Sequence, residues 1–324
     1  MKPQVFVSRL IPQAALDIVT AACDAEVNAA DTPLSHAELV GKVRGMEGLL
    51  CLLTDHIDES ILASSSRLKV VANVAVGFDN IDVQAATRRK IIVTNTPGVL
   101  DDTTADFAWC LLLASARQVV AADRFTRSGK YTGWGIMLFC GGDVHGKTLG
   151  ICGLGRIGRG VAKRAKGFDM RVLYTDAVRA AVEVERDLDV QFVDKETLFR
   201  EADFVTLHVP LLPETRHYVS VRELTLMKQT AHLINASRGP VVDETALVQA
   251  LRERWIAGAG LDVYEDEPQL TPGLADLDNI TLAPHIASAS VETRTKMAVM
   301  AATNLVDALH GRRPPHVVNP QVLG

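Results

Sequence analysis

The clearest signal of fold class in this chain is the run Thr148-Leu149-Gly150-Ile151-Cys152-Gly153-Leu154-Gly155-Arg156-Ile157-Gly158. It begins as a buried strand, and the apolar side chains that recur beyond Gly158 predict a helix. Gly153 permits a tight turn, Gly155 lets a pyrophosphate approach the backbone at the helix N-terminus, and Gly158 lets the helix pack closely on the sheet. The run therefore predicts a dinucleotide-binding turn, the alternative being a glycine turn without a ligand.

An acidic residue follows the next predicted strand at the spacing expected for such a turn. Val172–Thr175 leads into Asp176, which lies 21 residues after Gly155. A carboxylate in this position accepts hydrogen bonds from ribose hydroxyls and repels a 2′-phosphate. Asp176 therefore favours NAD(H), whereas Arg179 close by could offset the repulsion and leaves NADP(H) possible.

The rest of the chain repeats this alternation of strands and helices. Short apolar runs, many of them β-branched, are separated by stretches of helical periodicity. The clearest runs are Val5–Ser8, Leu49–Leu53, Val70–Val74, Ile91–Thr94, Thr148–Cys152, Val172–Thr175, Phe204–Val209, His232–Asn235, Gly258–Val263 and Ile280–Ala283. Such alternation predicts an α/β fold whose parallel sheets are covered by helices on both faces.

Three longer segments interrupt this alternation. Thr103–Phe125 is apolar on several sides, which is typical of one helix buried between two surfaces. Val291–His310 carries one amphipathic face and ends before Gly311, a residue that favours the C-terminus of a helix. Gly129–Gly142 has no period but many large apolar side chains, so we expect it to pack either on a partner subunit or on its own domain.

Length and composition narrow the class of protein. A chain of 324 residues predicts two domains or one large one. Its 48% hydrophobic and 23% charged residues exclude disorder, and its net charge of −5 argues against a nucleic-acid partner. Phe107–Ala116, the longest apolar run, is only half the roughly 20 residues that span a membrane, and Met1–Ser8 is too short for a secretory signal.

Cysteine and histidine spacing predicts no metal centre. The five cysteines form no metal-ligand or Cys-x-x-Cys pair, and no cluster of His, Asp and Glu has the spacing of a zinc site. Four of the cysteines lie in apolar segments, so we expect reduced thiols in the core of a cytoplasmic protein. His145 falls in a predicted turn and receives no role.

Side chains that could take part in a reaction follow three of the later predicted strands. Arg238 follows His232–Asn235, the acidic turn Glu265-Asp266-Glu267 follows Gly258–Val263, and His285 follows Ile280–Ala283. Because the carboxyl ends of parallel strands share one edge, we expect these residues beside the dinucleotide. Each has a bland alternative when taken alone: a surface salt bridge, a solvated acidic turn or a structural histidine.

Together these groups supply what the reduction of a 2-keto acid needs. An arginine holds a carboxylate or carbonyl at two points, and a histidine protonates the nascent alkoxide. A nearby carboxylate keeps that histidine charged. His208, at the end of Phe204–Val209, is expected near the cofactor rather than the reacting carbon.

With these motifs in place, the chain resembles the D-isomer-specific 2-hydroxyacid dehydrogenases, and within them the glyoxylate/hydroxypyruvate reductases. The resemblance covers essentially the whole chain. The motifs that carry it are Val76–Asp82, Asn95–Leu100, Asp143–Gly150, the glycine turn, His208-Val209-Pro210, Asn235–Gly239, Asp262–Pro268 and Pro284-His285-Ile286.

The resemblance implies a role for individual residues. Arg238 orients the substrate, His285 is the acid/base, and the position before Pro268 selects Glu267 over Glu265 as the partner of His285. Leu53, Val76 and Gly77, with Arg238 and His285, would contact the substrate. Together with the glycine turn, the resemblance gives these cofactor contacts: Thr104, Gly153, Gly155, Arg156, Ile157, Gly158, Asp176, His208, Val209, Pro210, Ala236, Ser237, Asp262 (on the nicotinamide amide), His285 and Ser288.

The resemblance also implies an architecture. We expect two doubly wound, parallel-sheet, Rossmann-like domains. The dinucleotide-binding domain, residues 101–287, would be inserted in a split substrate domain, residues 1–100 and 288–324, with the active site in the cleft between them. The family is usually a homodimer through its coenzyme domains, which would bring the loop Trp134–Leu138 near the neighbour's active site.

Two departures and two alternatives bear on the substrate. Ala287 stands where the family usually has glycine, and Val76 replaces the lysine of the phosphite dehydrogenases, which argues against phosphite. Reduction of 2-ketogluconate or of a branched 2-keto acid is an alternative within the family. A dinucleotide-sensing corepressor is an alternative of another class, against which the intact set Arg238, Glu267 and His285 argues.

Overall fold

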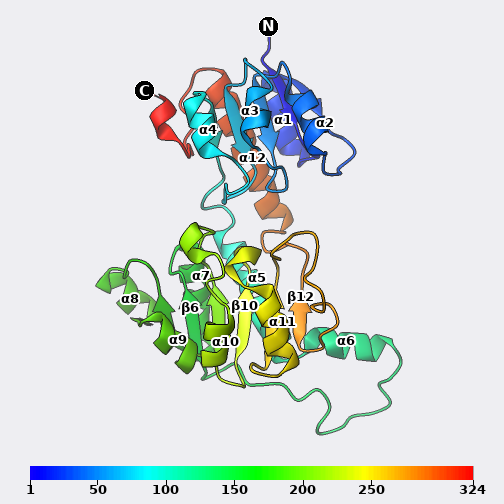
Figure 1. Cartoon of the computed structure of the whole chain (residues 1–324), viewed down its shortest axis with the longest axis vertical. Coiled ribbons are helices and arrows are strands. Elements are labelled where there is room, and N and C mark those ends of the chain that lie inside the picture. The colour runs from blue at the N-terminus through cyan, green and yellow to red at the C-terminus, as the bar shows by residue number, and fades with distance from the viewer. Residues whose placement is uncertain (324) are drawn as a thin grey trace. The chain divides into compact units, whose positions relative to one another are not determined.

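Two parallel β-sheets organise the structure, a computed structural model that describes residues 1–323 (Figure 1). The chain divides into two compact units. Unit 1 consists of Met1–Leu100 together with the chain from Ala289 onward, and unit 2 is Asp101–Ser288. The predicted α/β class with doubly wound parallel sheets is confirmed.

Unit 1 is built on a five-stranded sheet of order β2-β1-β3-β4-β5, in which every neighbouring pair is parallel. Apolar side chains pack on both faces of the sheet, one face under α1 and α12 and the other under α2, α3 and α4. Its strands are β1 (Gln4–Val7), β2 (Asp24–Val27), β3 (Gly48–Cys51), β4 (Val70–Asn73) and β5 (Ile92–Thr94). Its helices are α1 (Gln13–Ala22), α2 (His36–Val43), α3 (Glu59–Ala63), α4 (Val83–Arg88), α12 (Val291–Leu309) and the 3-10 helix Pro320–Leu323.

Unit 2 is built on a seven-stranded parallel sheet of order β12-β11-β10-β9-β6-β7-β8. The strand order reverses between β6 and β9, which is where open α/β sheets bind ligands. Its strands are β6 (Thr148–Cys152), β7 (Arg171–Thr175), β8 (Val190–Phe192), β9 (Phe204–Leu207), β10 (His232–Asn235), β11 (Gly258–Leu261) and β12 (Ile280–Leu282). Its helices are α5 (Asp101–Ala116), α6 (Val119–Arg127), α7 (Arg156–Ala165), α8 (Val182–Leu188), α9 (Lys195–Glu201), α10 (Val221–Leu226), α11 (Glu244–Arg252) and the 3-10 helices Lys166–Phe168, Pro213–Thr215 and Gly239–Val241.

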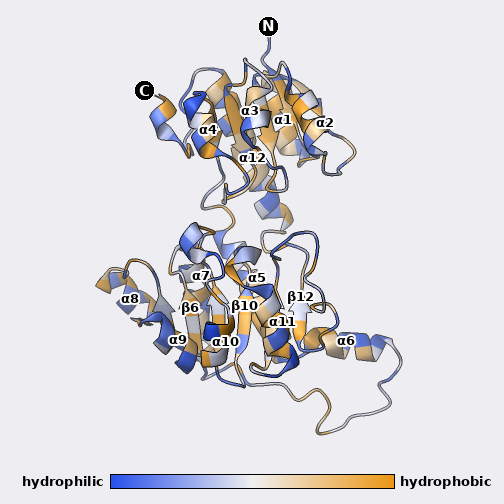
Figure 2. Ribbon diagram, in the orientation of Figure 1, coloured by the Kyte–Doolittle hydropathy of each residue, from blue (hydrophilic) through white to orange (hydrophobic). Residues whose placement is uncertain are grey.

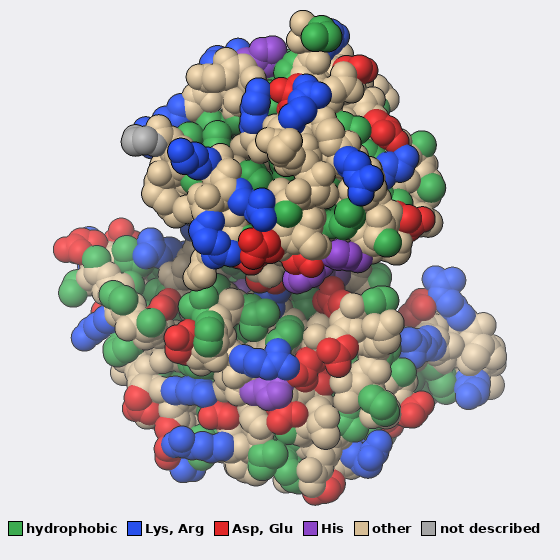
Figure 3. Space-filling model, turned by 45° about the horizontal axis from the view of Figure 1, so that its top comes forward, with side chains coloured by type: hydrophobic (Ala, Val, Ile, Leu, Met, Phe, Trp, Pro, Cys, Tyr) green, Lys and Arg blue, Asp and Glu red, His purple; other side chains and the backbone are tan. Residues whose placement is uncertain are grey.

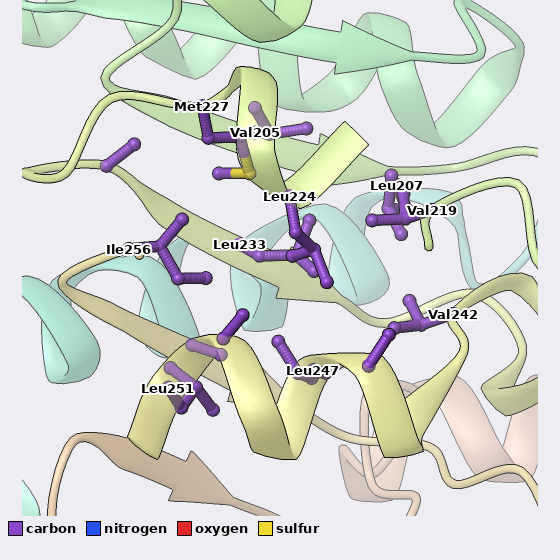
Figure 4. Close-up of a cluster of buried hydrophobic side chains, with 14 of the residues drawn as sticks. Val205, Leu207, Val219, Leu224, Met227, Leu233, Val242, Leu247, Leu251 and Ile256 are labelled. Atoms are coloured by element: carbon purple, nitrogen blue, oxygen red, sulfur yellow. The ribbon is translucent and has the colours of Figure 1, made fainter. Parts of the chain in front are cut away.

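The inner strands of both sheets are mostly hydrophobic, and the helices around them carry hydrophilic residues as well (Figure 2). In unit 2, one apolar cluster lies between the sheet and helices α10 and α11 (Figure 4). Leu247 and Leu251 of α11 are fully buried in this cluster beside Leu233 of β10. Burial of each such side chain is worth about 1.5–3 kcal/mol, so α11 is a firm support for the loop that precedes it.

The predicted helix Thr103–Phe125 was wrong in its length. The structure has two helices, α5 and α6, which meet at a bend of 64°. Gln118 adopts a left-handed conformation at the bend, and the returning chain occupies the end of α5 because Gly142 N donates to Ala116 O. Buried residues occur along α5, whereas α6 has none. The break depends on a contact distant in sequence, and no proline marks it.

Two strands and two thiols also differ from expectation. Strands β2 and β8 were not predicted, because each lies at a sheet edge and forms no apolar run. In β2 exposed and half-buried residues alternate, and in β8 only Val190 is buried. Cys23, Cys51 and Cys152 are buried, but Cys110 and Cys140 are exposed, so fewer of the thiols lie in the core than expected.

Candidate active site

The glycine turn forms at the reversal point of the larger sheet. Gly153, directly after β6, has φ +94°, and a Cβ there would lie 2.8 Å from the carbonyl oxygen of His208, directly after β9. Glycine therefore both permits the turn and lets two strand ends approach. Gly155 precedes α7, whose N-terminus has no side-chain cap, and a Cβ on Gly155 would meet no atom within 4 Å. Uncapped N–H groups facing open space fit a bound pyrophosphate.

Asp176 lies against this turn rather than on an unrelated surface. Its Oδ2 accepts a hydrogen bond of 2.7 Å from Leu154 N, and its Oδ1 accepts one of 2.7 Å from Ala177 N. The carboxylate thus joins the end of β7 to the glycine turn. Arg156 of the same turn is exposed, Ile157 is half-buried and Gly158 is buried.

Arg179, the residue that could offset the charge of Asp176, is engaged elsewhere. Its Nε and Nη2 donate to the two carboxylate oxygens of Glu185 at 2.8 and 2.9 Å, and the Tyr174 hydroxyl donates to Glu185 at 2.6 Å. These hydrogen bonds, first those of Arg179 and then that of Tyr174, lower the pKa of Glu185 to about 2. The guanidinium is therefore tied to a charged carboxylate.

His208 lies beside the glycine turn, since its carbonyl group approaches Gly153. Its Nε2 lies 2.9 Å from the Thr206 hydroxyl, while Nδ1 is buried without a partner among the described residues. Burial lowers the pKa of His208 to about 4, so the ring is neutral at physiological pH. Val209, which follows, is half-buried and Pro210 is exposed.

Arg238 lies on a turn at the end of β10 that the Asn235 side chain holds by hydrogen bonds. Asn235 is buried, its Oδ1 accepts hydrogen bonds from both N and Oγ of Ser237, and its Nδ2 donates to Arg238 O at 2.9 Å. A Cβ on Gly239 would overlap the main chain of Tyr264, so only glycine lets this turn approach the loop after β11. Sequence reasoning gave Asn235 no role, although a polar residue closing an apolar strand was a usable signal.

His285 and Glu267 form a hydrogen-bonded pair. His285 Nδ1 lies 2.9 Å from Glu267 Oε2, and Glu267 Oε1 accepts a hydrogen bond of 2.9 Å from Tyr264 N. Burial acts to raise the pKa of Glu267, but the hydrogen bond and charge of His285, with the charge of Arg238, lower it below its usual value. Glu267 is therefore a carboxylate, and unit 2 brings all three predicted catalytic residues into one electrostatic group.

Asp262 holds the main chain around His285. Its two carboxylate oxygens accept hydrogen bonds of 2.7 Å from Ile286 N and Ala287 N, and its carbonyl oxygen accepts one from His285 N. His285 has φ +55°, a left-handed conformation that is uncommon for a histidine. The carboxylate is fully buried, and burial raises its pKa. From the sequence, Asp262 was expected only at the nicotinamide amide, and its hydrogen bonds to the main chain around His285 were not foreseen.

The remaining predicted contacts are divided between the units. In unit 2, Thr104 on α5 and Ala236 are buried, whereas Ser237 and Ser288 are half-buried. In unit 1, Leu53 follows β3, and Val76 and Gly77 follow β4.

A polar network holds these two loops of unit 1 together. Asn80 Nδ2 donates to Leu52 O and Asp55 O, and Asn80 Oδ1 accepts from Asn73 Nδ2, which also donates to Gly77 O. The loops that carry Leu53, Val76 and Gly77 are therefore one connected surface.

Among residues 1–323, no group of three or more His, Cys, Asp or Glu could hold a metal ion. No single helix of these residues is long and apolar enough to cross a membrane, and only α5 and α6 taken together pass on length and composition. On the face shown in Figure 3, acidic and basic side chains are interspersed.

A turn that fits a pyrophosphate, on the same sheet as a hydrogen-bonded His–Glu pair and an arginine, defines a dinucleotide-dependent oxidoreductase. A model of the family "D-isomer specific 2-hydroxyacid dehydrogenase, NAD binding domain" matches residues 109–287. The chain belongs to this family of D-isomer-specific 2-hydroxyacid dehydrogenases, and it is an NAD(P)-dependent oxidoreductase acting on CH–OH groups.

Individual relatives agree with this assignment over their full lengths. A glyoxylate reductase of Korarchaeum cryptofilum is 51% identical over 100% of this chain and 98% of its own. The crystal structure of a glyoxylate reductase from Paecilomyes thermophila has a TM-score of 0.87 at 29% identity, covering 99% of each chain. An NADPH-dependent glyoxylate/hydroxypyruvate reductase from Sinorhizobium meliloti, solved with NADP and malonate, has a TM-score of 0.85 at 31% identity and covers 98% of this chain and 97% of its own.

Proposed function

We propose that this protein reduces glyoxylate and hydroxypyruvate to the corresponding 2-hydroxy acids. The His285–Glu267 hydrogen bond carries the proposal, because it fixes the imidazole through Nδ1 at the sheet edge and leaves Nε2 to serve as the proton donor. Relatives of about half-identical sequence are named glyoxylate reductases, and a neighbour of the same fold is a glyoxylate/hydroxypyruvate reductase.

The chain's own residues would bind the acid and move one proton. Arg238 would hold the substrate carboxylate or carbonyl through its guanidinium. When bound, the reduced nicotinamide supplies a hydride to C2 of the keto acid, and the electron pair of the carbonyl π bond moves to oxygen. His285 would give the proton on Nε2 to that oxygen, while Nδ1 keeps its hydrogen bond to Glu267. The product is the 2-hydroxy acid, and His285 is left neutral.

NAD(H) is the proposed cofactor. The carboxylate of Asp176 at the glycine turn would repel a 2′-phosphate, and Arg179 is paired with Glu185. The Sinorhizobium meliloti neighbour is NADPH-dependent, so cofactor preference differs within the fold or is relaxed here. Oxidation rates with NADH and NADPH at equal concentration would measure the preference.

We assign substrate binding in unit 1 to Leu53, Val76 and Gly77, and cofactor binding to unit 2. The N–H groups of Val76 and Gly77 would donate to the substrate carboxylate, and the Asn80 network supports this by joining their loop to that of Leu53. Cofactor binding is assigned to unit 2 because the glycine turn lies at the reversal point of its sheet.

The protein is proposed to be a cytoplasmic homodimer that forms through unit 2. Trp134, Ile136 and Met137 are 80%, 75% and 78% exposed, so the apolar loop Trp134–Leu138 does not pack within unit 2. Figure 1 shows the segment between α6 and β6 extending from the sheet of its own unit. A second copy of unit 2 would cover these side chains. The five unpaired cysteines support a reducing compartment.

The decisive test is NADH and NADPH oxidation by the purified protein against glyoxylate, hydroxypyruvate, pyruvate, 2-ketogluconate and branched 2-keto acids. We expect the highest kcat/KM with glyoxylate or hydroxypyruvate. His285→Gln should retain NADH binding and lose about 10²–10⁴-fold in kcat. Preference for 2-ketogluconate or a branched acid would shift the substrate assignment. Tight NADH binding without turnover of any acid would favour the corepressor-like alternative and overturn the proposal.

A further inference from the structure

Glu244, the first residue of α11, is a buried carboxylate that the proposed mechanism does not use. The residue is 1% exposed. Its Oε1 accepts a hydrogen bond of 2.8 Å from Glu265 N, and its Oε2 accepts one of 2.6 Å from the Thr271 hydroxyl. Both oxygens therefore bind the loop that follows β11, and they bind it at two points six residues apart in sequence.

The loop held in this way carries Glu267. Glu265 and Thr271 lie on either side of it, so Glu244 restrains the chain before and after the carboxylate that pairs with His285. The turn inside the loop is closed by Tyr264 N, which donates to Glu267 Oε1. A shift of the loop would therefore change the Glu267–His285 distance.

Glu244 lies at the start of a helix that is capped by Asp243 and anchored in the apolar core. Helix α11 begins after Asp243, whose side chain accepts from Ala246 N, and its inner face contributes Leu247 and Leu251 to the apolar cluster of Figure 4. Burial raises the pKa of Glu244, which the hydrogen bonds from Thr271 and Glu265 N oppose and the nearby charge of Glu265 reinforces. These contacts depend on two hydrogen-bonding atoms at the end of the Glu244 side chain more than on its charge.

We propose that Glu244 is a positioning residue, which sets the geometry of the Glu267–His285 pair by holding the loop from Glu265 to Thr271. The inference rests on the proposed function, because it treats that pair as the acid–base group. Its effect would reach the reaction only through Glu267, since the carboxylate oxygens of Glu244 are bonded to the loop.

Three variants test the proposal in the full-length protein. Glu244→Ala removes both contacts, and Thr271→Val removes one while leaving Glu244 in place. Glu244→Gln removes the charge but retains an acceptor for Glu265 N and an amide that can donate to Thr271 Oγ1. Val248→Ala trims a buried side chain of the same helix that lies near Gly273, beyond the segment from Glu265 to Thr271, and it is the matched control for packing loss.

We expect Glu244→Ala to lower kcat by about 10–100-fold, the scale of a sub-ångström to ångström displacement of a reacting group, with NADH affinity retained. The alkaline limit of keto-acid reduction should also move to lower pH, in the direction caused by Glu267→Gln. Thr271→Val should show the same changes more weakly, and Glu244→Gln should restore most of the activity.

Several results would overturn the inference while leaving the proposed function intact. One is a Thr271→Val variant that keeps both the wild-type kcat and the wild-type alkaline limit of keto-acid reduction. Another is a loss in Glu244→Gln as large as in Glu244→Ala. A third is an equal pH change in Val248→Ala. If instead His285→Gln retained full turnover, the proposed function itself would fail. If Glu244→Ala does not fold, Thr271→Val and Glu244→Gln still decide the question.

Discussion

Replacing Glu267 by glutamine should move the pH limits of both directions of the reaction to lower pH, so that reduction and oxidation lose different amounts of activity at neutral pH. Reduction needs the charged imidazole of His285 as proton donor, whereas oxidation of a 2-hydroxy acid needs the neutral ring as acceptor. The carboxylate stabilises the charged ring, because Nδ1 and Oε2 are 2.9 Å apart and the same contact lowers the pKa of Glu267. Glutamine keeps an acceptor but removes the charge.

The size of the effect follows from that distance. Two unit charges 2.9 Å apart attract by about 1.4 kcal/mol in water and by about 6 kcal/mol at an effective dielectric constant of 20. The His285 and Glu267 side chains are 26% and 30% exposed, so solvent screens much of this attraction. One pH unit corresponds to about 1.4 kcal/mol. We therefore expect both pH limits to move down by about one to two units.

Initial rates of keto-acid reduction and 2-hydroxy-acid oxidation, measured from pH 5 to 10 for Glu267→Gln, would show the effect. The alkaline fall of reduction and the acidic rise of oxidation should both move to lower pH. At neutral pH, reduction should therefore lose more activity than oxidation. Asp266→Asn, an exposed neighbour changed in the same way, is the control and should keep the wild-type limits. Equal loss in both directions with unmoved pH limits would refute the role of Glu267.

Three further predictions concern the cofactor, the assembly and the stability. Glu185→Gln should free Arg179 and raise the NADPH/NADH ratio of kcat/KM by several-fold, and the additional change Arg179→Ala should cancel the gain; an unchanged ratio would show that Arg179 does not reach the adenosine site. Trp134→Glu should halve the mass measured by light scattering, because it places a charge in the proposed dimer surface, and an unchanged dimer would place the interface elsewhere. Burial lowers the pKa of His232 to about 4, below the roughly 6.5 of an unfolded histidine, so its contribution of up to about 3 kcal/mol is complete above pH 6.5 and is lost as pH falls toward 4. His232→Gln should therefore flatten the fall of the melting temperature between pH 6.5 and 4, and a slope equal to that of the wild type would contradict this.

Sequence patterns were informative where burial is continuous. The central strands were predicted because a parallel strand covered on both faces reads as an apolar run, as in β6 and β9. Edge strands β2 and β8 lack such a run and were missed. The bend after α5 was missed because Gln118 is held by a returning segment, through Cys140 O and Gly142, and nothing local marks it.

The candidate site divides in the same way. Arg238, His285 and the acidic turn 265–267 could be named in advance because each follows a strand of one sheet, and parallel strands end at a common edge. The choice of Glu267 within that turn came from the family resemblance. Residues that act by holding others could not, since Asp262, Asn235 and Glu244 show their importance only through the main-chain groups they bind.

The amino-acid sequence by itself determined the alternation of strands and helices, the glycine turn and the types of side chain at the sheet edge, because these depend on neighbours in the chain. Only the tertiary structure decided which of those side chains meet. Glu267 pairs with a residue 18 positions away, and Glu244 with one 27 positions away. Hydrogen bonds of this kind require both partners to be placed within about 3 Å, and that placement comes from the packing of whole elements.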